Sequence, residues 1–347
     1  MKKLVKENIQ KFAPYIVDKE PVRILLNANE SPYNLFQYLK EEFIGKLEGR
    51  DLNRYPDTDS EDLRKALAKY LVVQKENIIC GNGSDEIIQM IIHTFVGKGD
   101  TVIIPTPTFS MYGKFSSIGE GKVIEVPSYE DFKINVGEII EQANKNRAKL
   151  IFLCNPNNPT GTLISREFIL EIIQKTSSMI VLDEAYGDFC KENNLDLIKN
   201  PKVIILRTFS KAFSLAGARL GYGISHKNTI NTLYKVKSPY NLNTFSQLIG
   251  EMVLENVDLV KRVIEKIIKE RDRVFQELKN IKTVQVYPSH ANFIFMKSEK
   301  IETIIMECKK EGIAIRDYSD PSLKEYIRLS IGTPEENDQV LNIIKGV

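Results

Sequence analysis

The sequence predicts an α/β protein: a large domain with a mainly parallel sheet between helices, followed by a smaller α+β domain. Two observations carry this prediction. Between about residues 60 and 240, short β-rich runs alternate with amphipathic helical patterns, which is typical of a parallel sheet. The runs are apolar throughout rather than alternating with polar residues, which indicates strands covered on both faces.

The elements of the larger domain follow from these runs. Strands are expected at residues 77–80, 101–105, 122–126, 149–154, 179–183, 203–207 and 219–224. The clearest helical patterns between them span residues 84–95, 136–145 and 165–176.

After residue 240 the pattern changes. A long charged helical stretch is expected over about 244–280, since Glu, Lys and Arg are frequent there. It leads to short strands near 283–286, 292–297, 313–316 and 326–330, flanked by helices near 301–310 and 334–345. We therefore expect an N-terminal arm over residues 1–30 that packs with the small domain and the active site, a large domain over 31–240 and a small domain over 241–347.

Composition excludes several function classes. The 347 residues include 48 basic and 46 acidic side chains, so no basic face is implied and nucleic acid is not an expected partner. No window approaches the roughly 18 apolar residues of a membrane span, and the N-terminus lacks the apolar block of a secretory signal. The four cysteines form no CxxC and there are three histidines, so we expect no metal site and reduced thiols in a cytoplasmic protein.

Three segments hold residues that strand ends would bring together. CNPNNPTG (154–161) is a turn directly after one expected strand, and VLDEAYGDF (181–189) carries Asp183 at the end of the next. TFSKAFSLAGARLGYG (208–223) places Lys211 between small residues. Each has an ordinary interpretation, such as a polar loop or a helix cap, but open α/β sheets bind ligands at the carboxyl ends of their strands.

Taken in order, Asn158, Asp183, Tyr186, Ser210-Lys211 and Arg219 resemble the fold-type I aminotransferases, which use pyridoxal 5′-phosphate (PLP). The resemblance covers nearly the whole chain and implies that fold and that cofactor. It implies that Lys211 forms a Schiff base with the PLP aldehyde and carries protons, because a lysine amine can do both. Asp183 would pair with the pyridine nitrogen, while Tyr186 and Asn158 would bind the 3′-oxygen of the ring.

The cofactor phosphate needs hydrogen-bond donors. GNGSDEII (81–88) delivers a glycine-rich turn into a helix, whose first N–H groups make an anion site. The resemblance assigns the amides of Ser84 and Asp85 to the phosphate, together with the Ser210 hydroxyl and the Arg219 guanidinium. A dinucleotide-binding interpretation fails because Glu86 occupies the position of the third glycine.

Two aromatic residues complete the expected cofactor site. Phe109 in PTPTFSMY (105–112) matches the ring that stacks on the cofactor, although a core phenylalanine is the commoner use of such a residue. Tyr55 in RYPD (54–57) matches the tyrosine that reaches the PLP phosphate of the partner subunit. The resemblance therefore implies a homodimer with shared active sites.

Within the family the chain is most similar to the histidinol-phosphate aminotransferases. The segments that carry this are LNANESPY (26–33), GNGSDEII, PTPTFSMY, HANFIF (290–295), IRDYS (315–319) and YIRLSIGTPEEN (326–337). Arg328 would bind the substrate α-carboxylate through a bidentate contact, and Arg316 the substrate phosphate. Asn29 and Tyr15 would close over the substrate.

The implied reaction exchanges the amino group between L-histidinol phosphate and 2-oxoglutarate, and runs in histidine biosynthesis from imidazole-acetol phosphate and glutamate. The alternatives are an aromatic or broad-specificity amino-acid aminotransferase and a threonine-phosphate decarboxylase of the same fold. A non-catalytic protein of this fold is a further possibility, which the retention of Lys211, Asp183 and Arg328 disfavours.

Overall fold

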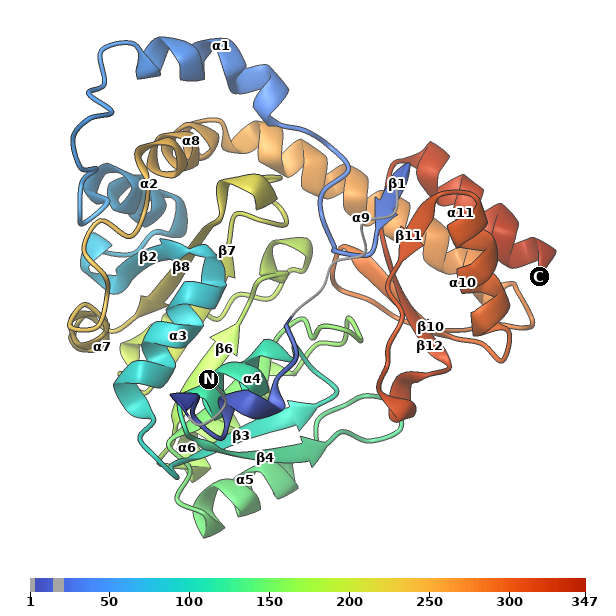
Figure 1. The fold of residues 1–347 in the computed structure, drawn as a ribbon, viewed down its shortest axis with the longest axis horizontal. Helices are drawn as coiled ribbons and strands as arrows, with labels where there is room; N and C mark the ends of the chain where they lie inside the picture. The colour runs from blue at the N-terminus through green and yellow to red at the C-terminus, as the bar shows by residue number, and fades with distance from the viewer. Residues whose placement is uncertain (1–3, 15–21) are drawn as a thin grey trace.

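A computed structural model of the chain describes residues 4–14 and 22–347. The chain forms a larger lobe built on a wide sheet and a smaller lobe that holds the C-terminal elements (Figure 1). The wide sheet has the order β2-β8-β7-β6-β5-β3-β4. Its strands are β2 (Ile78–Asn82), β3 (Thr101–Thr106), β4 (Lys122–Pro127), β5 (Leu150–Cys154), β6 (Met179–Asp183), β7 (Val203–Thr208) and β8 (Leu220–Ser225).

The prediction of a mainly parallel sheet is confirmed. Only β8 runs against its neighbours, pairing antiparallel with both β2 and β7. The prediction that both faces are covered is also confirmed, because Val181 and Leu182, successive residues of β6, are both fully buried and belong to different core clusters. A strand points successive side chains to opposite faces, so each face of this sheet has its own core.

Helices cover both faces of the sheet (Figure 1). Residues of α3 (Gly83–Phe95), α4 (Met111–Ile118) and α7 (Lys227–Leu233) pack into one core cluster. Residues of α1 (Phe36–Leu47), α2 (Glu61–Leu71), α5 (Val136–Lys145), α6 (Arg166–Lys175) and α8 (Thr244–Glu255) pack into the other.

The long charged helix expected over 244–280 is two helices. α8 ends at Glu255 and α9 (Val257–Lys279) begins after Asn256, whose backbone leaves the helical region (φ −110°, ψ 34°). α8 carries eight buried residues and no basic side chain, whereas the charged pattern belongs to α9 alone. The expectation of one continuous charged helix was therefore wrong at this point.

The smaller lobe contains two sheets. β10 (Phe293–Lys297) lies between β9 (Gln285–Tyr287) and β12 (Tyr326–Ser330) in an antiparallel sheet, and α10 (Ile301–Lys310) and α11 (Pro334–Gly346) accompany it. β1 (Ile24–Leu26) pairs in parallel with β11 (Ile313–Ile315), so a segment near the N-terminus lies beside the C-terminal lobe. Farther upstream, the Asn8 side chain donates to Ser117 O at the end of α4 at 2.7 Å.

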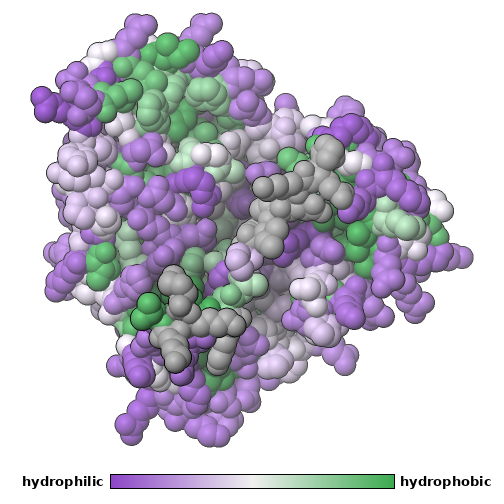
Figure 2. Space-filling model, in the orientation of Figure 1, coloured by the Kyte–Doolittle hydropathy of each residue, from purple (hydrophilic) through white to green (hydrophobic). Residues whose placement is uncertain are grey.

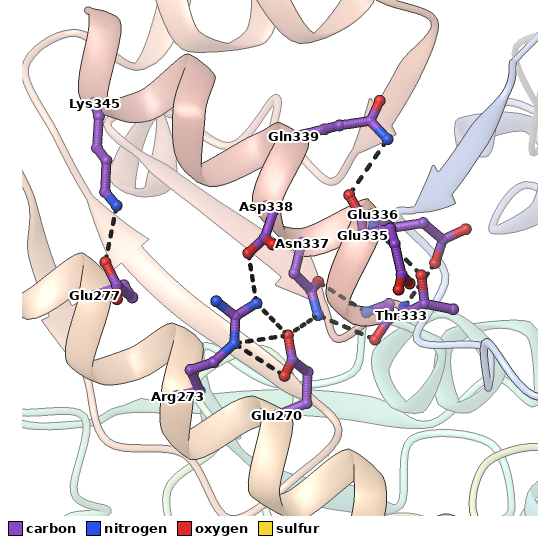
Figure 3. A network of polar contacts seen from close by, with 11 residues as sticks. Glu270, Arg273, Glu277, Thr333, Glu335, Glu336, Asn337, Asp338, Gln339 and Lys345 are labelled. Carbon is purple, nitrogen blue, oxygen red and sulfur yellow. Dashed lines mark hydrogen bonds and ion pairs between the residues drawn. The ribbon is translucent and has the colours of Figure 1, made fainter.

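A polar network fixes α11 to α9 (Figure 3). Arg273 on α9 pairs with Glu270 at 2.6 Å and with Asp338 on α11 at 2.7 Å. The fully buried Asn337 also donates to Glu270, at 3.0 Å. Thr333 caps the first turn of α11 as half of a capping box. The last helix is therefore anchored to the helix that leads out of the larger lobe.

The four cysteines are free, and three of them are buried. Among residues 4–14 and 22–347, no helix is both long and apolar enough to cross a membrane.

Candidate active site

The site lies at the carboxyl ends of β5, β6 and β7. Cys154 at the end of β5 is the register partner of Asp183 at the end of β6, and the turn with Asn158 follows Cys154. Lys211 lies three residues beyond the end of β7. Because these strands are parallel and adjacent, the loops that follow them meet at one edge of the sheet.

Asp183 is a buried carboxylate, 3% exposed. Its Oδ2 accepts a hydrogen bond of 2.6 Å from the Tyr112 hydroxyl, and its Oδ1 accepts one of 3.0 Å from the N–H of Ala185. Burial raises the pKa of Asp183 to about 6, although these two donors oppose the rise. In the described part of the chain no cationic side chain forms an ion pair with it.

Lys211 donates from Nζ to the carbonyl oxygen of Ala28 at 2.8 Å. Desolvation, together with the nearby positive charge of Arg328, lowers the pKa of Lys211 to about 8. Such a lysine holds a much larger neutral fraction at pH 7–8 than an exposed lysine does. It is therefore suited to act as a nucleophile or a base.

The first turn of α3 and Arg219 form an anion cradle. Gly83 has φ +73°, and a Cβ there would lie 2.6 Å from Arg219 Nη2, so the guanidinium lies over the helix start. The side chain of the N-cap residue, Asn82, accepts no hydrogen bond from this turn, which leaves the amides of Ser84 and Asp85 free of a side-chain cap. Arg219 itself adopts a left-handed backbone (φ 49°), a strained geometry that is frequent at functional sites.

Thr208 links Ser210 to the chain segment next to Arg219, because its Oγ1 contacts both Ser210 Oγ and the carbonyl oxygen of Leu220. The Ser210 hydroxyl is buried and accepts from Thr208 Oγ1 at 3.0 Å. Arg219 pairs with Asp85 at 3.4 Å. The charge of Asp85 also affects the pKa values of Lys211 and Asp183, which places the cradle, the lysine and the buried carboxylate in one site.

Asn29 joins Tyr186 to the smaller lobe. Its side-chain amide donates to the Tyr186 hydroxyl at 3.0 Å, and its backbone N–H donates to Ser330 Oγ at 2.8 Å. Its carbonyl oxygen accepts from Asn292 at 2.9 Å. Asn29 is buried with φ 54°, a conformation that asparagine tolerates better than most residues.

Arg328 on β12 also points into the site. Its Nη1 donates to Asn158 Oδ1 at 2.5 Å and its Nη2 to the carbonyl oxygen of Asn27 at 2.7 Å. Its Nε is buried and has no acceptor among the described residues. A buried guanidinium N–H without a partner costs free energy, so an anionic ligand here would satisfy it.

The chain is similar along its length to known enzymes. Residues 21–344 match the family described as Aminotransferase class I and II. The chain belongs to this family. It is 40% identical over 343 residues to a histidinol-phosphate aminotransferase of Clostridium kluyveri, with 99% of this chain and 98% of the relative covered.

Solved structures agree on the fold of this aminotransferase. Histidinol-phosphate aminotransferase of Sinorhizobium meliloti in complex with pyridoxal-5′-phosphate superposes with a TM-score of 0.90 at 25% identity, covering 99% of this chain and 96% of that one. L-threonine-O-3-phosphate decarboxylase of Porphyromonas gingivalis superposes with a TM-score of 0.80 at 24% identity, covering 93% and 98%. The fold alone therefore does not separate an aminotransferase from a decarboxylase.

Two expected site residues of the aminotransferase, Arg316 and Tyr55, lie at its margin or beyond it. Arg316 is exposed and joins the site through its backbone pairing with Arg328. Tyr55 is 79% exposed and stacks on Tyr240, with ring centroids 4.4 Å apart. Tyr15 lies outside the described residues. The half-buried Phe109 meets Tyr112 edge to face, with centroids 5.4 Å apart.

Several residues of the site were not identified from the sequence. Tyr112 lies in the quoted PTPTFSMY segment, but nothing in that segment signals a contact with Asp183 71 residues later. Ser330 and Asn292 hold Asn29 across more than 260 residues. The contacts of Asn29 depend on how the two lobes pack together, which no local sequence pattern predicts.

Proposed function

We propose that this chain is a PLP-dependent aminotransferase that exchanges the amino group between L-histidinol phosphate and 2-oxoglutarate in histidine biosynthesis. The observation that carries the proposal is the presence, in one site, of Lys211 with a lowered pKa and Asp183 as a buried carboxylate without a cationic partner. The 40% identity to a histidinol-phosphate aminotransferase over nearly the whole chain supports the choice of substrate.

The buried carboxylate fits the ring end of the cofactor. Burial destabilises the Asp183 anion, and the negative charges of Asp85 and Glu184 add to this effect. A protonated pyridine nitrogen would supply the missing positive charge. Asp183 would in turn keep that nitrogen protonated, which is the role the family resemblance gives it.

The cradle fits the phosphate end. The first amides of α3, the Ser210 hydroxyl and the Arg219 guanidinium are all hydrogen-bond donors, and a helix N-terminus favours an anion. Phe109 would cover one face of the ring, and Tyr186 and Asn158 would donate to its 3′-oxygen. The Tyr186 oxygen accepts a hydrogen bond of 3.0 Å from the Asn29 side chain, which leaves its hydroxyl proton to donate to the cofactor.

When bound, PLP supplies an aldehyde that links to amines and a ring that accepts electrons from the substrate Cα. Lys211 would hold the cofactor covalently until the substrate amine displaces it. The freed amine of Lys211, whose pKa is lowered to about 8, would then move the proton between the substrate Cα and C4′ of the cofactor. The Ala28 carbonyl, 2.8 Å from Nζ, would orient it. The two half-reactions share this one site, so the first product would leave before the second substrate binds and ping-pong kinetics are expected.

Arg328 would bind the α-carboxylate of glutamate, since its Nε lacks an acceptor and its two terminal nitrogens are already oriented by Asn158 and Asn27. Arg316 would bind the phosphate of histidinol phosphate. Asn29, and Tyr15 from the arm over residues 1–30, would close over the substrate. We also propose that the chain divides into this arm, a large domain over residues 31–240 and a small domain over residues 241–347.

We also propose a cytoplasmic homodimer with shared active sites. Tyr55 is strongly exposed and its ring stacks on Tyr240, so it is available to a partner subunit. Large apolar side chains are exposed near it and on α1, including Ile44, Leu52, Tyr240 and Phe245. Apolar surface gathers over α1 at the top of Figure 2, and such surface is typical of an interface.

A substrate panel tests the proposal. Glutamate formation from 2-oxoglutarate is measured with histidinol phosphate, with phenylalanine and with tyrosine, and release of CO₂ is measured with O-phosphothreonine. We expect the largest kcat/KM with histidinol phosphate. A larger kcat/KM with the aromatic amino acids would show that histidinol phosphate is not the preferred substrate. Release of CO₂ without glutamate formation would show that the reaction is a decarboxylation.

A further inference from the structure

Tyr112 contacts both Phe109 and Asp183, the two residues expected to hold the face and the nitrogen of the cofactor ring. It is the second residue of α4 and is fully buried. Its ring stacks on Phe152 of β5 (centroids 4.6 Å apart, planes at 7°) and meets Phe109 edge to face. Two aromatic contacts thus fix the direction of its hydroxyl, which donates to Asp183 Oδ2 at 2.6 Å.

The hydroxyl can act only as a donor toward this carboxylate. Burial and the Asp183 charge raise the pKa of Tyr112 well above its ordinary value, so it stays protonated throughout the physiological range. The neighbouring Cys154 thiol is neutral as well, because burial raises its pKa to about 12. The remaining charged neighbours, Asp85 and Glu184, both disfavour the Asp183 anion.

We propose that Tyr112 is a positioning residue of this aminotransferase, whose hydroxyl orients the Asp183 carboxylate and holds it as the anion that the pyridine nitrogen of the cofactor requires. The Ala185 N–H fixes Oδ1 at 3.0 Å, so the two oxygens are held by one donor each. Each oxygen keeps a further lone pair for the ring nitrogen. This inference rests on the proposed function, since it assumes that Asp183 faces the ring.

The test is the dissociation constant for PLP of the full-length protein between pH 5.5 and 8, in the wild type and in Tyr112→Phe. Without the hydroxyl, Asp183 takes up a proton at higher pH, and PLP binding must then displace that proton. We expect affinity near wild type, within about threefold, at pH 8 and a roughly tenfold loss at pH 6, because hydrogen bonds to charged groups are strong. A loss that does not change with pH would overturn the inference, since lost packing affects binding equally at every pH.

The matched control is Tyr234→Phe. The Tyr234 hydroxyl is also buried, but no hydrogen-bond partner among the described residues contacts it. Its removal is expected to leave PLP affinity unchanged at every pH. If Tyr112→Phe does not fold, 3-fluorotyrosine at position 112 replaces it as a stronger donor of nearly the same shape. The onset of weakened binding should then move to lower pH, and an unchanged onset would overturn the inference.

Asp183→Asn separates failure of the inference from failure of the proposed function. If it weakens PLP binding and removes the pH dependence while Tyr112→Phe behaves as Tyr234→Phe does, only the role of Tyr112 is wrong. If Asp183→Asn binds PLP as tightly as the wild type, the assignment of Asp183 to the cofactor is wrong, and the inference fails with it.

Discussion

Arg316 and Arg328 lie directly opposite each other and are joined by two backbone hydrogen bonds. The N–H of Arg316 donates to the carbonyl of Arg328 at 3.1 Å, and the reverse bond measures 2.9 Å. Residues paired in this way project their side chains from the same face. Like charges placed opposite each other destabilise a sheet, so this pair is suited to binding the anionic groups of the substrates, the α-carboxylate of glutamate and the phosphate of histidinol phosphate.

The first prediction concerns this pair. We expect Arg316→Ala to lower kcat/KM for histidinol phosphate by roughly 10- to 100-fold, because a charge-assisted contact to the phosphate is lost. Turnover of phenylalanine, which carries no phosphate, should fall less than about threefold by the same reasoning. The control is Arg262→Ala, another exposed arginine, on α9. Equal losses for the two substrates would show that Arg316 does not bind the phosphate.

A second prediction concerns pH. The rate at which PLP attaches to the PLP-free protein should rise with pH and level off above a midpoint near 8, because the neutral amine of Lys211 is the reacting form and its pKa is lowered to about 8. Arg328→Leu removes a nearby positive charge and should move the midpoint to higher pH, whereas Arg262→Leu should not. Stopped-flow absorbance follows the attachment. A midpoint near 10.5, the ordinary lysine value, would mean that the site does not desolvate Lys211.

A third prediction tests the shared active site. Tyr55→Ala and Lys211→Ala are each expected to be nearly inactive. Subunits of the two variants are mixed after reversible dissociation, and each mixed dimer then holds one site with both wild-type residues. Activity should return to about a quarter of the wild-type value, since half of the dimers are mixed and half of their sites are intact. Lys211→Ala mixed with Arg328→Leu is the control, because those residues belong to one chain's site. No recovery in the first mixture would place Tyr55 outside the partner's site.

A fourth prediction concerns stability next to the site. Glu184, the residue after Asp183, forms a buried ion pair with Arg207 at 2.8 Å and also accepts from Asn194 at 2.9 Å. Arg207→Met leaves the Glu184 charge without its ionic partner and should lower the free energy of unfolding by about 3–5 kcal/mol. Lys175→Met removes a more exposed pair with Glu171 at 2.7 Å and should cost about 0–1 kcal/mol. Urea unfolding measures the free energy of unfolding of both variants. Similar losses would show that burial does not make the Arg207–Glu184 pair more important than an exposed pair.

The sequence predicted the strands of the larger sheet well, because each is a continuous apolar run bounded by turn residues. β6 begins and ends where the run 179–183 does. The interruption at Asn256 was missed because both sides of it have a helical pattern, and only the tertiary position of α8 against α2 and β8 requires the chain to turn there.

The site was predictable to the extent that its residues lie in short motifs. The motifs at Asn158, Asp183 and Lys211 each follow a strand, so the parallel sheet brings them to one edge. The backbone pairing of Arg316 with Arg328 and the contact of Tyr112 with Asp183 were not predictable. They depend on the register of a short bridge and on the docking of a helix on the sheet.

The central claim is that Lys211 and the residues around it exchange an amino group between histidinol phosphate and 2-oxoglutarate. The most direct measurement is the visible spectrum of the PLP-loaded protein during stepwise addition of the two compounds, with Lys211→Ala and the exposed Lys227→Ala measured beside it. We predict that histidinol phosphate bleaches the visible band, that 2-oxoglutarate restores it with one glutamate formed for each site, and that only Lys211→Ala loses both changes. A band that histidinol phosphate leaves unchanged, or a Lys211→Ala variant that still forms glutamate, would contradict the claim.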